Sequence, residues 1–198
     1  MPLLTQQSGK RLRSGGRAHA ALAVRSGGFT LIELMVTVAV AAVLLVIAVP
    51  SFKSITLSNR LNTSVNDLIA SLNTARMEAI KTNASVQFCS NSASVNTSGT
   101  LGILCGTEAG AVIATTGASG TKVRSGPTTI TGTIQFHGNV QALRYGGDGL
   151  ARAVGSTTLF DGPVADICTS SLSTDNHRVI TMTSGSILVT TTTPGACP

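Results

Sequence analysis

The hydrophobic positions along the chain form one long unbroken run followed by a periodic stretch. Residues 29–49 are 21 residues long and contain a single charge, Glu33. With a helical rise of about 1.5 Å per residue, this run reaches about 30 Å, the thickness of a bilayer core. The run therefore predicts a helix that spans a membrane.

Beyond Pro50 the apolar residues recur every three or four positions, which is the spacing of one helical face. These positions are Leu57, Leu61, Val65, Leu68, Ile69, Leu72, Ala75, Ala79 and Ile80. The pattern predicts that the helix continues to about Asn83 and packs this stripe on a globular domain. Because a proline inside a helix removes one backbone hydrogen bond and clashes with the preceding turn, we expect a kink at Pro50.

After Asn83 the sequence changes to short alternating runs rich in Thr, Ser, Gly and Val, which are typical of strands. The predicted strands are 85–89, 128–136, 140–144, 178–182 and 187–191. Clusters of Gly, Asn, Asp and Pro separate them as turns. We therefore expect an α+β fold in which the long N-terminal helix packs on an antiparallel β-sheet.

The positive charge of the chain is concentrated at its N-terminus. The formal net charge is +6, and five of the 14 basic residues precede Gly28, where there is no acidic residue. After Gly28, nine basic residues nearly balance eight acidic ones. Since Lys and Arg accumulate on the cytoplasmic side of a membrane span, the N-terminus is predicted to be cytoplasmic and residues 51–198 exported.

Two simpler interpretations of the apolar run, a secretory signal and a plain membrane anchor, fit the sequence less well. A secretory signal has an apolar region of about 7–15 residues that ends at a small-residue cleavage site, whereas this run is longer and ends in Val49-Pro50. A plain anchor does not account for Glu33, because a carboxylate at the bilayer centre costs about 2.5–3.5 kcal/mol. A charge at this position requires a partner.

The sequence RSGGFTLIEL at residues 25–34 resembles the type IV prepilin signal. The resemblance implies that a prepilin peptidase cleaves after Gly28 and methylates the new amino group of Phe29. It also implies that Glu33 pairs with the N-terminal amine of a neighbouring subunit, which would supply its partner. Pro50 lies where this family often has a helix-kinking proline.

Two further stretches, LNTARMEAIK at 72–81 and SVQFC at 85–89, resemble the GspH/FimT family of minor pilins and type II secretion pseudopilins. ADIC at 165–168, RVI at 178–180, SGSI at 184–187 and Cys197 are similar to its minor-pilin members, including FimU-like proteins. The resemblance implies the type IV pilin fold, with a leader at 1–28, a transmembrane and assembly half-helix at 29–50, an amphipathic half-helix at 51–83 and a β-rich head at 84–198.

The function that the resemblance implies is that of a minor pilin that joins a type IV pilus and primes or caps its assembly in a tip complex. The implied partners are prepilin peptidase, other minor pilins, the major pilin and the inner membrane. The protein would cross the inner membrane once, with its head in the periplasm, and then reach the pilus at the cell surface. The alternatives are a type II secretion pseudopilin H and a DNA-binding minor pilin for natural transformation.

The four cysteines, Cys89, Cys105, Cys168 and Cys197, all lie in the exported part, where disulfides persist. Of the three possible connectivities, Cys89–Cys105 and Cys168–Cys197 are favoured, because each closes a local loop rich in turn residues. The second also resembles the C-terminal loop of minor pilins. No C-x-x-C motif occurs, and His137 and His177 are isolated in sequence, so neither a metal site nor a cofactor is predicted.

No enzymatic motif is present: the sequence has no G-x-S-x-G, no H-E-x-x-H and no P-loop. The stretch at 146–149, GGDG, has the composition of an anion or calcium loop, but such glycine turns are more often simple loops. His177 and Arg178 are interpreted as residues of a strand edge and turn. We therefore predict no catalytic residue.

DNA binding is not expected. Members of this family that act in transformation use a G-R-x-R pattern near the C-terminus, whereas residues 184–189 here read SGSILV. Lys122 with Arg124, or Arg144 with Arg152, are candidates for a weak phosphate-binding patch. We interpret them as solvated strand residues because the exported charges nearly balance.

Overall fold

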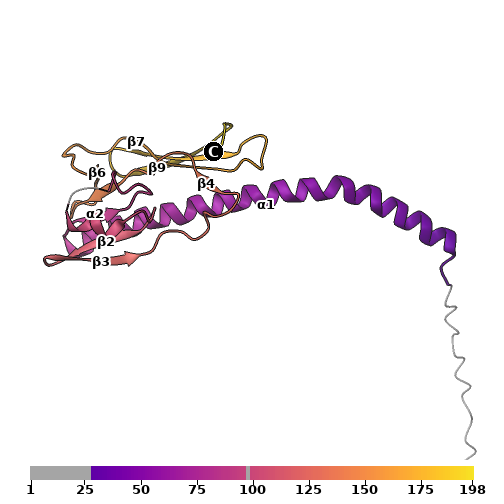
Figure 1. Ribbon diagram of the computed structural model, residues 1–198, viewed down its shortest axis with the longest axis horizontal. Helices are drawn as coiled ribbons and strands as arrows, with labels where there is room; N and C mark the ends of the chain where they lie inside the picture. The colour runs from indigo at the N-terminus through magenta and orange to yellow at the C-terminus, as the bar shows by residue number, and fades with distance from the viewer. Residues whose placement is uncertain (1–27, 97–98) are drawn as a thin grey trace, which may run out of the picture. The chain divides into compact units, whose positions relative to one another are not determined.

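The computed structural model describes residues 28–96 and 99–198 (Figure 1). The predicted leader, apart from Gly28, lies outside the described residues. The chain divides into two compact units, residues 1–43 and 44–198. One helix, α1 (Leu31–Thr82), begins in the first unit and ends in the second.

The ends of α1 are set by local hydrogen bonds. At the start, the Glu33 N–H donates to the Thr30 hydroxyl at 3.2 Å, so Thr30 caps the helix. At the end, the Ala84 N–H reaches the Ala79 carbonyl at 3.3 Å, and Asn83 takes a left-handed φ of 48°. This is the Schellman arrangement, which satisfies the last carbonyls of a helix.

Pro50 lies inside α1, and the helix continues on both sides of it. The first five helical residues that follow Pro50 are all exposed. The kink at this residue stays a prediction.

The strands form two antiparallel sheets, where the sequence predicted one. The first sheet contains β1 (Val86–Phe88), β2 (Val112–Thr116), β3 (Ser119–Arg124), β5 (Leu143–Tyr145) and β6 (Ala151–Ala153), in the order β3-β2-β1-β5-β6. The second contains β4 (Gln135–Phe136), β7 (Gly162–Cys168), β8 (His177–Thr183) and β9 (Ile187–Thr193), in the order β4-β7-β8-β9. A short helix, α2 (Thr100–Cys105), follows β1.

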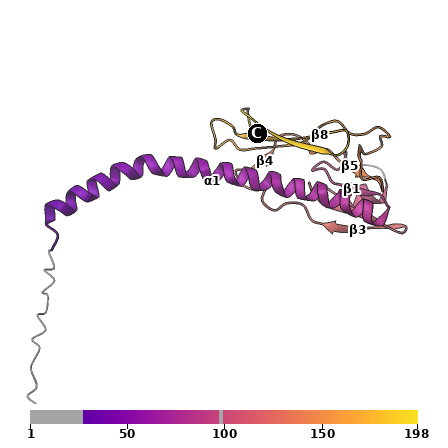
Figure 2. The same cartoon turned by 180° about the vertical axis from the view of Figure 1, so that it is seen from behind.

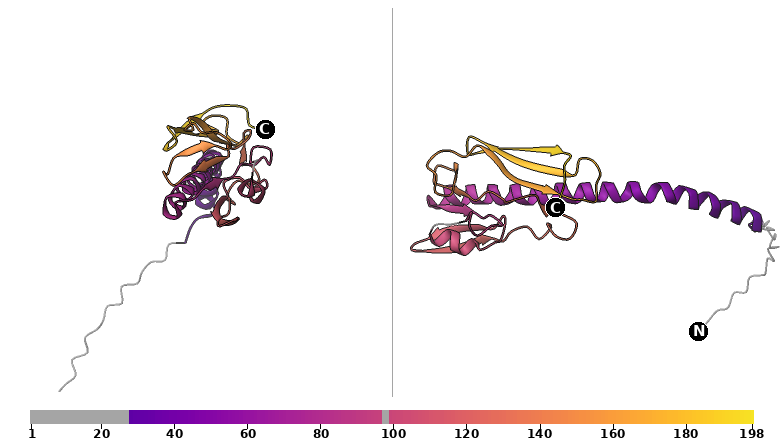
Figure 3. Two further views of the ribbon diagram at one scale, coloured as in Figure 1. Left: turned by 90° about the vertical axis from the view of Figure 1, so that its left-hand side faces the viewer. Right: turned by 45° about the horizontal axis from the view of Figure 1, so that its top comes forward.

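The C-terminal part of α1, whose buried residues run from Leu61 to Ala79, lies between the two sheets. Figures 2 and 3 show β3 on one side of this helix and β8 and β9 on the other. One hydrophobic core joins α1 to both sheets: Leu68 and Leu72 of the helix are buried with Phe88 of the first sheet and Ile167 of the second. The α+β pilin-like fold expected from the sequence is confirmed, with the helix covered on two sides.

The predicted stripe of α1 matches most of the buried face. Leu61, Val65, Leu68, Leu72, Ala75 and Ala79 are buried, while Leu57 and Ile69 are half-buried. Ile80 differs, because 51% of it is exposed. Two serines that were not predicted, Ser64 and Ser71, also lie on the buried face. They donate to the carbonyls of Arg60 and Asp67, so their hydroxyls are satisfied within the helix.

The predicted strand at 128–136 is wrong over most of its length, since only Gln135 and Phe136 form β4. The Thr129 hydroxyl in this segment donates to the Asp67 carboxylate of α1 at 3.0 Å. Residues 128–134 therefore run beside the helix as a connection between the two sheets. Helix α2 and strands β2, β3, β6 and β7 were not predicted.

Candidate processing and assembly segment

The backbone just before α1 is accessible. Gly28, Phe29 and Thr30 are exposed and belong to no helix or strand, and nothing lies within 4 Å of where a Gly28 side chain would begin. Phe29 is 79% exposed. The peptide bond between Gly28 and Phe29 thus lies in irregular, open backbone next to the helix start, where a peptidase can reach it.

Glu33 stands in the first turn of α1. Helix N-termini carry a partial positive charge, so a carboxylate there is stabilised by about 0.3–1 kcal/mol. The cap residue Thr30 and Glu33 form the T-x-x-E pattern of a capping box, in which the Thr30 hydroxyl accepts from the Glu33 N–H. Thr30 was not predicted, although this spacing is a helix-start signal that can be recognised in the sequence.

The surface of α1 between Leu31 and Val49 is entirely exposed, and it is apolar apart from Glu33 and Thr37. Within the described residues, α1 is the one helix that is long and apolar enough to cross a membrane. The Thr37 hydroxyl in this stretch donates to the Leu34 carbonyl at 2.9 Å, so its polar group is already satisfied. Such a surface requires lipid or the apolar faces of other helices around it, and it has the properties of a membrane anchor.

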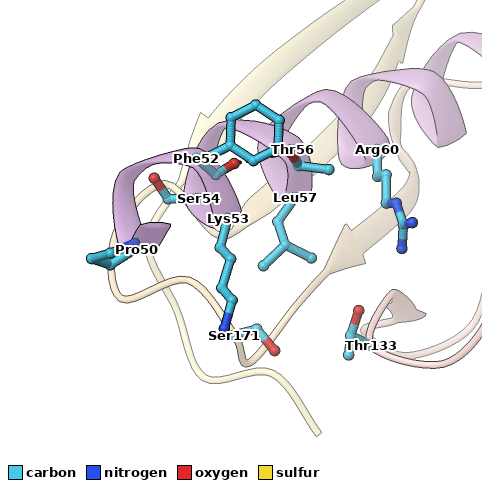
Figure 4. A pocket seen from close by; sticks show the side chains of 9 residues that line it. All are labelled: Pro50, Phe52, Lys53, Ser54, Thr56, Leu57, Arg60, Thr133 and Ser171. Atoms are coloured by element: carbon cyan, nitrogen blue, oxygen red, sulfur yellow. Dashed lines mark hydrogen bonds between the residues drawn. The ribbon is translucent and has the colours of Figure 1, made fainter. Parts of the chain in front are cut away.

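The exposed apolar surface continues past Pro50 to a groove of about 650 Å³ (Figure 4). Lys53, Leu57 and Arg60 project from the same side of α1 into this groove, while Thr133 and Ser171 approach from the connecting loops. Phe52 and Ile55 nearby are 72% and 56% exposed. The helix therefore offers a mixed apolar and basic surface directly beyond the anchor.

The four cysteines form two disulfides, in the connectivity that the sequence favours. Cys89–Cys105 joins the end of β1 to the end of α2, with 5.4 Å between the Cα atoms. Cys168–Cys197 joins the end of β7 to the C-terminal segment, with 5.7 Å between the Cα atoms. The first fastens the α2 region to the first sheet, and the second fastens the chain end to the second sheet.

The stretch at 146–149 is the turn between β5 and β6. The Gly149 N–H donates to the Gly146 carbonyl at 2.9 Å, and the Asp148 carboxylate accepts from Arg152 Nη2 at 2.8 Å. The hydrogen bond from Arg152, followed by one from the Leu150 N–H, lowers the pKa of Asp148. The geometry is that of a structural turn, with the carboxylate committed to a neighbouring strand residue.

Three of the four basic residues that are candidates for phosphate binding make polar contacts within the head. Lys122 pairs with Glu108, and this hydrogen bond is the main cause that lowers the pKa of Glu108. Arg144 Nη2 donates to Gln87 Oε1 at 2.8 Å, and Arg152 binds Asp148. Three of the four candidate residues thus make contacts within the fold, and the absence of DNA binding stays a prediction.

His177 and Arg178 point to opposite faces of the second sheet. Arg178 reaches α1, where its Nε donates to Asn62 Oδ1 at 2.9 Å and its Nη2 to the Ser58 hydroxyl at 3.0 Å. His177 Nδ1 lies 2.9 Å from the Asp166 carboxylate on the other face. The two residues therefore do not form one site, whereas His137 and His177, distant in sequence, both contact Asp166.

Comparison with known families agrees with this geometry. A family model described as type II transport protein GspH matches residues 64–190, and a model of the prokaryotic N-terminal methylation motif matches residues 24–49. The second match contains Gly28, Phe29 and Glu33. No curated protein and no solved structure was found to match the chain. The chain belongs to the GspH family and is a type IV pilin-like or pseudopilin-like protein, processed at an N-terminal methylation site.

Proposed function

We propose that this protein is a minor pilin that primes or caps the assembly of a type IV pilus as part of a tip complex. The observation that carries the proposal is the exposed apolar half of α1, which begins three residues after Gly28 and has Glu33 in its first turn. A surface of this kind is suited to move from lipid into a bundle of similar helices. Cleavage after Gly28 by prepilin peptidase, and methylation of Phe29, would prepare it for that step.

Glu33 is proposed to select the position of the subunit in the bundle. Within the described residues it is the one charge between Gly28 and Val49, and a carboxylate buried among apolar helices requires a compensating positive charge. The N-terminal amine of a neighbouring subunit would provide it. The carboxylate therefore sets the height at which one helix can dock beside the next.

The head is proposed to act as a structural and binding module with no catalytic activity. The candidate polar groups of the turn at 146–149 and of the strand pair at 177–178 are engaged in contacts within the fold. Before assembly, the head would lie in the periplasm and α1 in the inner membrane, as the basic leader indicates. After assembly, the protein would be at the pilus tip on the cell surface.

A second candidate function is that of pseudopilin H in type II secretion. It is favoured by the description of the matching family, whose model covers the packed half of α1 and most of the head. Both functions use the same processing and the same helix. The two differ in the machine into which the subunit is assembled.

The test is deletion of the gene in the source cell and complementation with a labelled chain. A short epitope placed between Gly117 and Ala118, which are both exposed in the turn between β2 and β3, avoids α1 and both disulfides. We expect the deletion to reduce the number of surface fibres, and immunogold electron microscopy to find sparse label at one fibre end. A secretion defect with normal fibres would identify the pseudopilin, and dense label along the fibre would contradict a minor role.

A further inference from the structure

Three side chains that are far apart in sequence meet on one face of the second sheet. Asp166 belongs to β7, His177 belongs to β8, and His137 directly follows β4. In the strand register Cys168 pairs with His177, and the His137 N–H donates to the Asp166 carbonyl at 2.9 Å. Directly paired residues share a face and alternate along a strand, so all three project from the face opposite to Ile167 and Arg178, which face α1.

The donor atoms of this cluster are close to one another. His177 Nδ1 lies 2.9 Å and His137 Nδ1 lies 3.3 Å from the same oxygen, Asp166 Oδ2. One donor atom from each residue lies within 4.8 Å of the other two. The imidazole rings meet edge to face, with centroids 5.2 Å apart. A single carboxylate oxygen thus bridges two imidazoles.

The C-terminal segment covers one side of the cluster and holds His177 in place. The Asn176 side chain makes two hydrogen bonds to the Gly195 backbone: it donates to the carbonyl at 2.8 Å and accepts from the N–H at 3.0 Å. A side chain on Gly195 would begin 2.9 Å from His177 Nε2, so glycine permits the close approach. Only 5% of the His177 side chain is exposed. The disulfide Cys168–Cys197 fixes this C-terminal segment next to His177. The His177 ring is therefore held in one orientation.

His177 is buried with one ring nitrogen unused. Among the described residues, its Nε2 is a buried polar atom without a hydrogen-bond partner. An unsatisfied buried polar group costs about 1–3 kcal/mol. Nε2 lies on the side of Gly195, whereas Nδ1 faces Asp166, so Nδ1 is the atom that His177 offers to the cluster.

We propose that His137, Asp166 and His177 bind one divalent transition-metal ion of the zinc class. Two imidazoles and one carboxylate are a donor set that Zn²⁺ uses, with bonds of about 2.0–2.2 Å. Such bonds place neighbouring donor atoms a little more than 3 Å apart in a tetrahedral site, which the separations of 2.9 and 3.3 Å approach. His137, whose side chain is 51% exposed, can rotate to close the longest separation.

The site is open on the side of His137. Three protein ligands leave a fourth position for water or for a side chain of another molecule. Buried His177 and half-buried Asp166 are the two rigid ligands of the site. His137 supplies the third ligand from a loop. This site goes beyond the role of the apolar helix in assembly, and its failure would leave that role untouched.

The experiment measures zinc binding by the untagged mature chain in detergent micelles, because a histidine tag would itself bind metal. Competition with a chromophoric chelator gives affinity and stoichiometry, and Co²⁺ substitution gives a visible spectrum that reports coordination number. The test variant is His137→Ala, which removes an exposed ligand and should leave folding intact. The matched control is Asn139→Ala, which alters an exposed neighbour on the same loop.

We expect one zinc ion per wild-type chain, and binding at least about tenfold weaker in His137→Ala, since even loss of an outer partner of a ligand commonly weakens metal affinity by about 10–100-fold. Asp166→Asn should weaken it similarly, while Asn139→Ala should match the wild type. Two results would overturn the proposal: no saturable binding by the wild-type chain at millimolar zinc, or equal affinity in the wild type and His137→Ala. The second result would assign the ion to another group, such as the N-terminal amine.

Discussion

Arg178 is a buried cation that connects the second sheet to α1. It is only 6% exposed, and its guanidinium donates to Asn62, to Ser58 and, at 2.6 Å, to the Asp175 carbonyl. Arg178→Met keeps an unbranched side chain of similar reach and removes these donors. We expect it to lower the free energy of unfolding by about 1.5–3 kcal/mol, the contribution of hydrogen bonds that involve a charged group.

Urea unfolding of residues 51–198, followed by circular dichroism, measures this loss. The matched control is Arg124→Met at the end of β3, which should change stability by no more than about 0.5 kcal/mol, as surface substitutions do. Equal effects of the two substitutions would show that the bonds from Arg178 to α1 contribute nothing to stability.

Gly149 combines a left-handed backbone with a close neighbour. Its φ is 70°, and a side chain there would begin 2.6 Å from Ile80 Cδ1. Gly155 also has a left-handed φ, of 84°, but nothing lies within 4 Å of it. Thermal unfolding should therefore show a loss of about 1 kcal/mol or more in Gly149→Ala and a smaller loss in Gly155→Ala. A double variant with Ile80→Ala should recover the difference, and no recovery would exclude the contact as its cause.

The pair formed by Glu108 and Lys122 predicts a small dependence of stability on pH. Hydrogen bonds from Lys122 and the Gly126 N–H lower the pKa of Glu108 below its ordinary value of 4.5. The stabilisation is therefore fully present above pH 4.5 and is lost as the pH falls through the lowered folded-state pKa. Both side chains are over a third exposed, so it should not exceed about 1 kcal/mol.

The measurement is the difference in unfolding free energy between the wild type and Glu108→Gln across this range. The difference should shrink towards acidic pH, and at about 1 M salt, where the Debye length is about 3 Å, it should shrink at neutral pH as well. A difference that grows on acidification would contradict the lowered pKa.

At the scale of elements, the sequence predicts those helices and strands whose hydrophobic residues recur with a regular period. The stripe of α1 repeats every three or four residues for more than twenty residues, so its helix and buried face were recognised to within one residue at the C-terminal end. Strand β2 begins with three consecutive buried residues, Val112–Ala114, and shows no alternation. Strand β3 has no buried residue, and its polar sequence resembles a loop. Both strands are defined by pairing with a neighbour, which periodicity does not report.

The candidate sites also differ in whether their residues are close in the sequence. Gly28, Phe29 and Glu33 lie within a few residues of one another, so their spacing can be recognised from the sequence alone. His137 and His177 are forty residues apart and meet because β4, β7 and β8 pair in a particular register. Register between distant strands is a tertiary property, and the cluster with Asp166 therefore had no signal in the sequence.

The disulfide Cys168–Cys197 is predicted to stabilise the fold and to hold the C-terminal segment in place over His177. It closes a separation of 29 residues, for which the chain-entropy estimate is about 3–4 kcal/mol of stability. Cys168→Ala with Cys197→Ala should lower the urea midpoint and also expose His177 to diethyl pyrocarbonate, as the cover at Gly195 is released. The matched control is Cys89→Ala with Cys105→Ala, which should lower stability by a similar amount and leave His177 protected. Protection of His177 in both variants would show that Asn176 alone holds the segment.

At the scale of the whole molecule, the excess positive charge and the exposed apolar surface lie in different parts of the chain. The basic residues before Gly28 account for nearly all of the net charge, and the part that follows is close to neutral. The apolar surface of α1 is exposed as far as Ile55, and from Leu61 onward one face of the helix is buried against the sheets. Processing therefore converts a strongly basic precursor into a nearly neutral chain with one long apolar surface.

Glu33 provides the test of how that surface is used. If its carboxylate pairs with the amine of a neighbouring subunit, Glu33→Ala should be cleaved normally and inserted into the membrane, yet incorporate poorly into fibres, because the neighbour's buried amine loses its counter-charge. N-terminal sequencing of the membrane fraction should find Phe29 first in both wild type and variant. Immunoblots of sheared fibres should show at least a several-fold loss of the variant.

The matched control is Thr37→Ala, which lies one turn further along α1 and whose hydroxyl already bonds to the Leu34 carbonyl. It should assemble as the wild type does, since it alters the helix surface without altering charge. Glu33→Gln separates charge from size: a defect equal to that of Glu33→Ala requires the negative charge, whereas normal assembly of Glu33→Gln would mean that a hydrogen bond at this position is sufficient. Normal assembly of Glu33→Ala would leave the apolar surface as the sole determinant of docking. The carboxylate in the first turn would then serve only the helix start, by its favourable interaction with the partial positive charge of the helix N-terminus.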